Sequence, residues 1–146
     1  STPGEGSTFS FTLLIYETEA PRRVLVVDDD PNVVQLIRQM LATSQLNLDL
    51  RTTNSGLEAL IELGDSRPHL LILDMHLPDV QGQHVLVSLR HRMSDHPCKV
   101  LVISGDADAL QQFTGQGADD YLLKPFLAKE LIQKVVALLG IERRRR

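Results

Sequence analysis

The sequence predicts a doubly wound α/β domain, in which a five-stranded parallel sheet has helices on both faces. Short apolar runs alternate with longer segments of helical period, which is typical of βα units. The runs are apolar at nearly every position, as in strands covered on both faces. The chain has 146 residues, 42% of them hydrophobic. This size suits one domain with a single core.

Five segments of the chain are predicted to be strands. They are residues 24–27, 48–52, 70–73, 100–103 and 121–123. We expect the strand order 2-1-3-4-5, which makes the first and third strands neighbours at the point where the order reverses.

The first and last helices carry the clearest signals. Asp30 can cap the first helix, and Pro31 suits its first turn. The last helix starts near Leu127, repeats apolar residues at helical spacing and is predicted to end at Gly140.

The three helices between them have weaker boundaries. One covers residues 55–63 and is expected to end at Gly64, and another covers about residues 83–92. A helix near residues 108–116 has only Leu110 and Phe113 as large apolar anchors. We expect that helix to be the loosest.

Polar residues follow the predicted strands at the edge where a parallel sheet binds its ligands. Asp28 and Asp29 follow the first strand, Asp74 the third, Ser104 the fourth and Lys124 the fifth. Clustered carboxylates either raise a pKa or bind a hard cation such as Mg²⁺. A carboxylate that attacks a phosphoryl group needs such a cation, and a lysine, to offset the repulsion between like charges.

Each of these signals has an ordinary structural explanation when taken alone. An acidic run after a strand is more often a helix cap than a metal site, and a Lys-Pro pair is usually only a loop. The conjunction is more specific, because four of the five strands end in a residue type that the same reaction needs.

With these motifs the chain resembles the receiver domain of two-component response regulators, which has a flavodoxin-like fold. The resemblance covers about residues 22–139. It rests on VLVVDDDP (24–31), LLILDMHLPDVQG (70–82), VLVISGDAD (100–108) and GADDYLLKPF (117–126).

The resemblance implies a phosphoacceptor site with Mg²⁺ as cofactor. Asp74 would be the nucleophile and a metal ligand. Asp29 would bind the metal directly and Asp28 through water, while the backbone carbonyl of His76 would complete the protein ligands. Asp30 is expected to be a helix cap, and the His76 ring is no indication of zinc.

The same resemblance implies residues that read out the phosphoryl group. Lys124 would pair with its oxygens, and Ser104 would hydrogen-bond one of them. Tyr121 matches the aromatic switch position of the family, although a half-buried strand tyrosine is the plainer reading. Pro78 and Gly82 would shape the loop after Asp74. The bond from Lys124 to its proline resembles the cis peptide of the family.

The first residues do not belong to the receiver pattern. Residues 1–16 resemble the last glycine box and closing strand of a histidine kinase ATP-binding domain, and an appended strand or a cloning remnant is the rival reading. Residues 17–23 would then be a linker, 24–140 the receiver and 141–146 a basic C-terminal tail. We therefore expect the receiver of a hybrid sensor histidine kinase.

Such a receiver would take a phosphoryl group from a kinase phosphohistidine and pass it to a histidine phosphotransfer domain. It would catalyse its own phosphorylation and dephosphorylation, so whether to class it as an enzyme stays open. The alternatives are a stand-alone single-domain regulator and a docking module that is never phosphorylated. A flavin-binding domain of similar topology is more distant, because no phosphate-binding loop follows the first strand.

Composition and charge restrict the cellular location and the kinds of partner that we expect. Cys98 has no second cysteine to pair with, and no apolar run reaches membrane-span length, so we expect a cytoplasmic domain without direct membrane contact, even if its parent kinase is membrane-attached. Between Val24 and Glu142 there are 16 acidic and 9 basic side chains. An acidic body disfavours nucleic acid as a partner.

Overall fold

The computed structural model describes residues 20–92, 97–113 and 117–141, and the structural statements below concern these residues. The elements in chain order are β1 (Arg22–Val27), α2 (Pro31–Ala42), β2 (Leu48–Thr53), α3 (Gly56–Ser66), β3 (Leu70–Asp74), α4 (Gly82–Arg92), β4 (Lys99–Ser104), α5 (Ala107–Phe113), β5 (Asp120–Leu123) and α6 (Ala128–Leu139).

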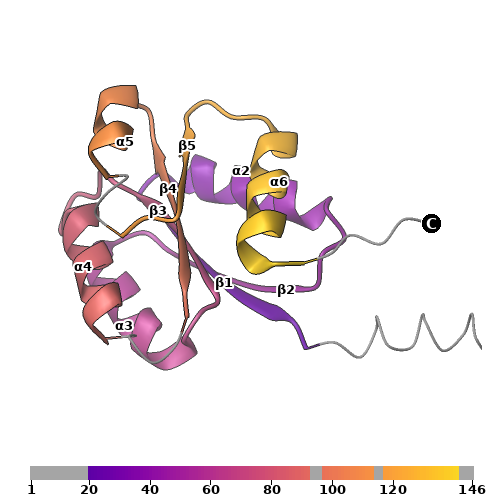
Figure 1. The fold of residues 1–146 in the computed structure, drawn as a ribbon, viewed down its shortest axis with the longest axis horizontal. Helices are drawn as coiled ribbons and strands as arrows, with labels where there is room; N and C mark the ends of the chain where they lie inside the picture. The colour runs from indigo at the N-terminus through magenta and orange to yellow at the C-terminus, as the bar shows by residue number, and fades with distance from the viewer. Residues whose placement is uncertain (1–19, 93–96, 114–116, 142–146) are drawn as a thin grey trace, which may run out of the picture.

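The five strands form one parallel sheet in the order β2-β1-β3-β4-β5, so the predicted fold class and strand order are confirmed. Val27 at the end of β1 pairs with Leu73 of β3, and Asp74 pairs with Ile103 of β4. Figure 1 shows α2 and α6 on one face of the sheet and α3, α4 and α5 on the other. The carboxyl ends of β1 and β3 therefore lie side by side at the reversal point.

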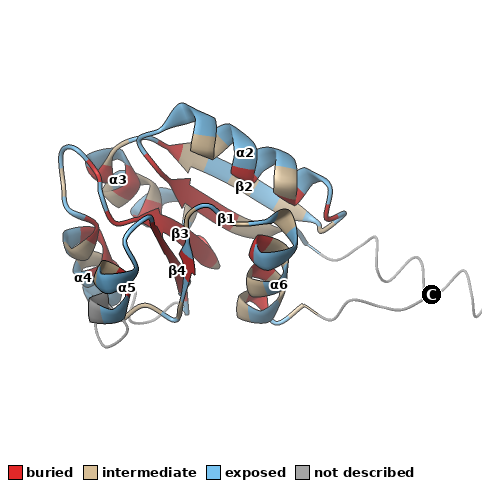
Figure 2. Cartoon of the chain, turned by 90° about the horizontal axis from the view of Figure 1, so that it is seen from above, coloured by how far each residue is buried: buried red, intermediate tan, exposed pale blue. Residues whose placement is uncertain are grey.

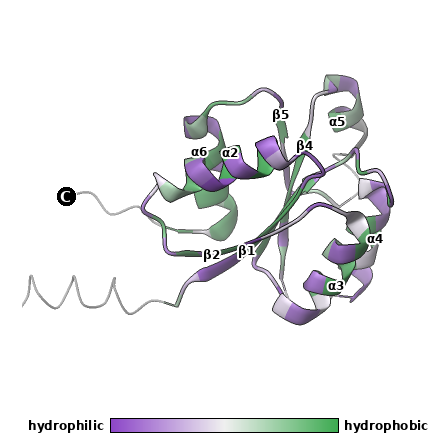
Figure 3. Ribbon diagram, turned by 180° about the vertical axis from the view of Figure 1, so that it is seen from behind, coloured by the Kyte–Doolittle hydropathy of each residue, from purple (hydrophilic) through white to green (hydrophobic). Residues whose placement is uncertain are grey.

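The sheet divides the core into two apolar layers because alternate side chains of each strand face opposite sides. One layer includes Leu25, Leu71 and Val102 and packs against α3, α4 and α5. The other includes Val26 and Ile72 and packs against α2 and α6. The central strands are buried in Figure 2 and strongly hydrophobic in Figure 3, whereas the helices expose polar outer faces. This agrees with strands that are apolar on both faces.

Local capping signals predicted two helix ends correctly. The Asp30 side chain accepts the Asn32 N–H at 2.9 Å and caps α2, with Pro31 in the first turn. Gly140 caps the C-terminus of α6 at φ 65°, a left-handed conformation that glycine adopts readily.

The predicted end of α3 at Gly64 is wrong. The helix continues to Ser66, and Arg67 follows in the left-handed region at φ 46°. A glycine inside a helix costs only about 1 kcal/mol, and the neighbouring Leu63 is 1% exposed in the core, so packing outweighs the local signal.

Most other boundaries differ by one or two residues, as is usual at the ends of elements. The helix expected near residues 108–116 is described as α5 from residue 107 to 113, and residues 114–116 lie outside the described part of the chain. The first strand starts at Arg22, so residues 22 and 23 of the predicted linker belong to the sheet. The kinase-like segment 1–16 and the C-terminal tail from residue 142 onward lie outside the described residues. Among the helices that are described, none combines the length and apolar character needed to cross a bilayer.

Candidate phosphoacceptor and metal site

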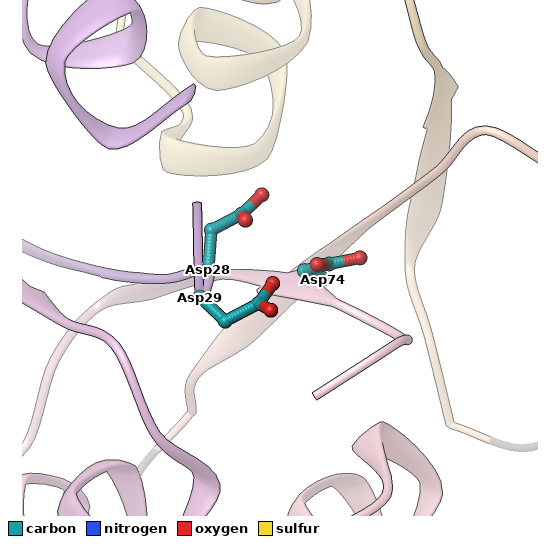
Figure 4. Close-up of side chains that lie close together, drawn as sticks. All are labelled: Asp28, Asp29 and Asp74. Atoms are coloured by element: carbon teal, nitrogen blue, oxygen red, sulfur yellow. The ribbon is translucent and has the colours of Figure 1, made fainter. Parts of the chain in front are cut away.

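Three carboxylates meet at the carboxyl ends of β1 and β3. Asp28 and Asp29 follow β1, and Asp74 is the last residue of β3 (Figure 4). One carboxylate oxygen from each lies within 4.8 Å of the other two. Asp28 and Asp74 are buried and Asp29 is exposed. The sheet register thus brings together the acids that the sequence placed at separate strand ends.

Lys124 reaches this cluster from the loop after β5. Its ammonium donates a hydrogen bond to Asp28 Oδ2 at 2.9 Å and lies 3.8 Å from Asp74 Oδ2. The Lys124 backbone N–H donates to the Ser104 carbonyl at 2.8 Å, which holds the loop against the end of β4. The Lys124–Pro125 peptide is cis.

The pKa of the Asp74 carboxyl is raised from its ordinary 3.8 to about 6, first by burial and then by the negative charges of Asp28 and Asp29. The His76 N–H and the Lys124 ammonium oppose this shift and limit its size. The His76 N–H donates to Asp74 Oδ1 at 3.2 Å. The site therefore disfavours ionisation of all three carboxyl groups at once, unless a further cation joins Lys124.

This donor set fits Mg²⁺. Mg²⁺ prefers oxygen ligands and is usually held by one or two carboxylates together with waters and phosphate oxygens. Asp28, Asp29 and Asp74 supply hard oxygens at one point, and the single lysine compensates only part of their charge.

Ser104 and Tyr121 lie on neighbouring strands close to this cluster. Ser104 is fully buried, and its hydroxyl accepts the Asp106 N–H at 3.0 Å. It pairs across the sheet with Leu123, two residues beyond Tyr121. Tyr121 is 46% exposed, with the Lys134 ammonium 5.7 Å from its ring centroid. This exposure is also that of an ordinary half-buried strand tyrosine, so it does not by itself distinguish a switch from the plainer reading.

The loop between β3 and α4 forms a cleft of about 450 Å³ beside Asp29. Its lining residues come from the segment after β1, this loop and the starts of α4 and α5: Asp29, Met75, His76, Leu77, Pro78, Gln81, Gln83 and Ala109. Gly82 ends the loop where a Cβ would lie 2.8 Å from the Met75 Cα, so this position needs glycine.

Two contacts near the site were missed in the sequence. Asp79 belongs to the quoted motif LPDVQG, yet nothing in that motif indicates that its carboxylate binds the N–H groups of Gly56 and Leu57. The second is the contact of Lys134 with the Tyr121 ring. From the sequence, Lys134 could be recognised only as a charge on the face of α6 nearest β5.

Comparison with known proteins identifies one family. The family model described as response regulator receiver domain matches residues 24–136. The transcriptional regulatory protein PrrA of Mycobacterium tuberculosis is 39% identical over 117 residues, which are 80% of this chain and 49% of that protein. The response regulator MprA of Mycobacterium avium is 37% identical over 80% of this chain and 50% of that protein. The chain spans about half the length of these curated relatives.

Solved receiver structures have the same fold. The signal receiver domain of a response regulator from Bermanella marisrubri is 35% identical with a TM-score of 0.73, covering 82% of this chain and 99% of that one. The response regulator TrrA of Thermotoga maritima, solved in complex with Mg²⁺ and BeF, is 30% identical with a TM-score of 0.72. That match covers 80% of this chain and 98% of that one.

Proposed function

The chain belongs to the response regulator receiver family, and from that premise we propose that it accepts a phosphoryl group on Asp74 from a phosphohistidine, with Mg²⁺ bound beside the acceptor. One observation carries the proposal. Asp28, Asp29, Asp74 and Lys124 converge at the reversal point of the sheet, so a nucleophile, a hard-cation site and a fixed positive charge occupy one place.

Each residue has a definite part in the reaction. An Asp74 carboxylate oxygen attacks phosphorus, the bond from phosphorus to the donor nitrogen breaks, and the donor imidazole leaves with the electron pair. Asp29, Asp74 and the backbone carbonyl of His76 would hold Mg²⁺ directly, and Asp28 would hold it through water. When bound, the metal neutralises phosphoryl charge and orients the oxygens. Lys124 supplies the second positive charge and moves little to do so, since it already lies 3.8 Å from Asp74.

Readout of phosphorylation is assigned to Ser104 and Tyr121. The Ser104 hydroxyl turns toward a phosphoryl oxygen and gives up the Asp106 N–H that it now accepts. The Tyr121 ring then occupies the space that the Ser104 hydroxyl has left. A few charge-assisted hydrogen bonds suffice when the two states differ by only a few kcal/mol.

Phosphorylation from a small phosphodonor tests the proposed function. Wild type incubated with Mg²⁺ and acetyl phosphate should gain one phosphoryl group on Asp74, and Asp74→Asn should gain none. Asp65→Asn, which changes an exposed acid on α3, is the matched control and should be labelled like wild type. A stable adduct mapped to another residue under the same conditions would overturn the site.

A separate part of the proposal concerns the kind of signalling protein in which this domain acts. The kinase-like pattern in residues 1–16 supports a receiver that serves a hybrid sensor kinase and relays to a histidine phosphotransfer domain. The names of the curated relatives favour a second candidate, a regulator of transcription. The gene sequence that precedes Ser1 decides between them, because a kinase ATP-binding domain there supports the first.

Phosphotransfer kinetics test the relay directly. A relay receiver should pass its phosphoryl group to a histidine phosphotransfer domain of the same genome within seconds to minutes. A receiver that controls transcription should instead keep the group until it hydrolyses. Transfer to none of the candidate phosphotransfer domains would overturn the relay and leave the acceptor assignment unchanged.

A further inference from the structure

Asp79 connects the loop that follows the acceptor to the first turn of α3. Its Oδ1 accepts the Gly56 N–H at 2.9 Å, and its Oδ2 accepts the Leu57 N–H at 3.1 Å. The side chain of Ser55, the N-cap of α3, accepts the Glu58 N–H at 3.1 Å and leaves the Gly56 and Leu57 N–H groups to Asp79. The first N–H groups of a helix have no partner within the helix, and the helix dipole favours a negative charge there. A carboxylate 23 residues further along the chain thus completes the capping of α3.

The backbones also approach closely at this contact. A Cβ on Gly56 would lie 2.7 Å from the Val80 Cβ and 3.1 Å from the Val80 carbonyl oxygen. Only glycine lets the loop come so near to the helix. The two hydrogen bonds and this packing therefore hold the middle of the loop at one position against α3.

The two ends of the loop are held by other contacts. At its start, the His76 N–H donates to Asp74 Oδ1. At its end, the Gly82 N–H donates to the Met75 carbonyl at 3.4 Å. Between them, Leu77, Pro78 and Gln81 line part of the cleft beside Asp29. Asp79 thus anchors the exposed part of the loop that borders the site.

We propose that Asp79 is a positioning residue for Mg²⁺ binding and phosphotransfer, which holds the His76 backbone beside Asp74 by fixing the loop to α3. The proposal rests on the proposed function, since it takes this loop to be part of the phosphoacceptor site. Residues that orient metal ligands typically change affinity by about 10–100-fold when removed. The Gly56 and Leu57 N–H groups lower the pKa of Asp79, which shows that they favour its charged carboxylate.

The matched control for Asp79→Ala is Ser55→Ala. Each variant removes a cap from the same helix end, but only the first releases the loop. We would measure the Kd for MgCl₂ by amide NMR titration, and the rate of labelling by acetyl phosphate. Asp79→Ala should raise the Kd about tenfold. Asp79→Asn, whose amide oxygen still accepts one N–H, should fall between Asp79→Ala and wild type, and Ser55→Ala should stay within about twofold of wild type.

Two outcomes would overturn the role of Asp79: an unchanged Kd in Asp79→Ala, or equal losses in Asp79→Ala and Ser55→Ala. Equal losses would mean that the helix cap alone matters. If Asp79→Ala does not fold, Asp79→Asn must still bind Mg²⁺ more weakly than Ser55→Ala does. Wild type that is not labelled on Asp74 would overturn the proposed function instead, and is thereby distinguished from a failure of the Asp79 proposal.

Discussion

The Lys124 ammonium lies 2.9 Å from the Asp28 carboxylate, which is 1% exposed. Asp28 Oδ1 also accepts the Asp30 N–H at 2.9 Å. Both oxygens of this buried carboxylate therefore already have protein partners. Asp29, its neighbour in sequence, is exposed and lines the cleft.

This difference predicts how the two acids contribute to Mg²⁺ binding. Asp28→Ala should weaken binding about tenfold, the effect of losing an indirect partner, and Asp29→Ala should weaken it further because a direct ligand is lost. NMR titration with MgCl₂ measures both, and Asp65→Ala serves as a charge-matched control. Equal affinities, or the reverse order, would count against the ligand roles.

The raised pKa of Asp74 predicts that the site reduces the stability of the metal-free protein. The carboxyl has a pKa of about 6 in the folded state against an ordinary 3.8, so between these values the folded state binds more protons. Stability should fall as pH rises from about 4 to 6. A shift of about two units is worth at most about 3 kcal/mol, so Asp74→Asn should stabilise the protein at pH 7 by about 2 kcal/mol.

Urea unfolding in the presence of EDTA measures this effect. The advantage of Asp74→Asn over wild type should disappear below about pH 4, where the carboxyl is protonated in both the folded and the unfolded state. Asp65→Asn should show no such dependence on pH. An advantage of the same size at pH 4 and pH 7 would show that charge is not its cause.

Ser104→Ala should leave Asp74 reactive, but phosphorylation should no longer change the conformation of the surface around Tyr121. The hydroxyl is the group proposed to move, and Ser104→Thr, which keeps a hydroxyl, is the control. Amide NMR with Mg²⁺ and beryllofluoride should show shifts from Ala107 to Tyr121 in wild type and Ser104→Thr. If Ser104→Ala shows the same shifts, coupling runs by another route.

Thr53→Val should stabilise the protein by about 1 kcal/mol. Thr53 is buried, and its hydroxyl has no hydrogen-bond partner in the part of the chain that the structure describes. An unsatisfied buried polar group costs about 1–3 kcal/mol, which an isosteric methyl avoids. Thermal unfolding measures the gain. Thr52→Val is the control and should give no gain, because the Thr52 hydroxyl accepts a hydrogen bond from Arg38 at 3.2 Å.

The number, type and order of the main elements could be predicted because each has a local physical cause. Apolar runs covered on both faces predict buried parallel strands, and a side chain such as Asp30 caps its helix within two residues. Gly64 shows the limit of local signals. Its cost inside a helix is small, and burial of Leu63 in the core decided that α3 continues.

The convergence of Asp28, Asp29, Asp74 and Lys124 could likewise be predicted from the sequence, since each follows the end of a predicted strand. Their distances could not. The placement of the ends of β1, β3 and β5 decides that Lys124 is hydrogen-bonded to Asp28 and lies further from Asp74. It also decides that Asp74 is buried and that its pKa is raised.

The sequence by itself thus determined the fold class and the set of chemical groups, because periodicity, capping and strand ends are local properties of the chain. The tertiary structure decided which groups touch. Asp79 meets Gly56 across 23 residues, and Arg90 of α4 binds Asp119 before β5 at 2.8 Å. Such contacts leave no periodic signal, because they arise only when packing of the two apolar layers brings distant loops together.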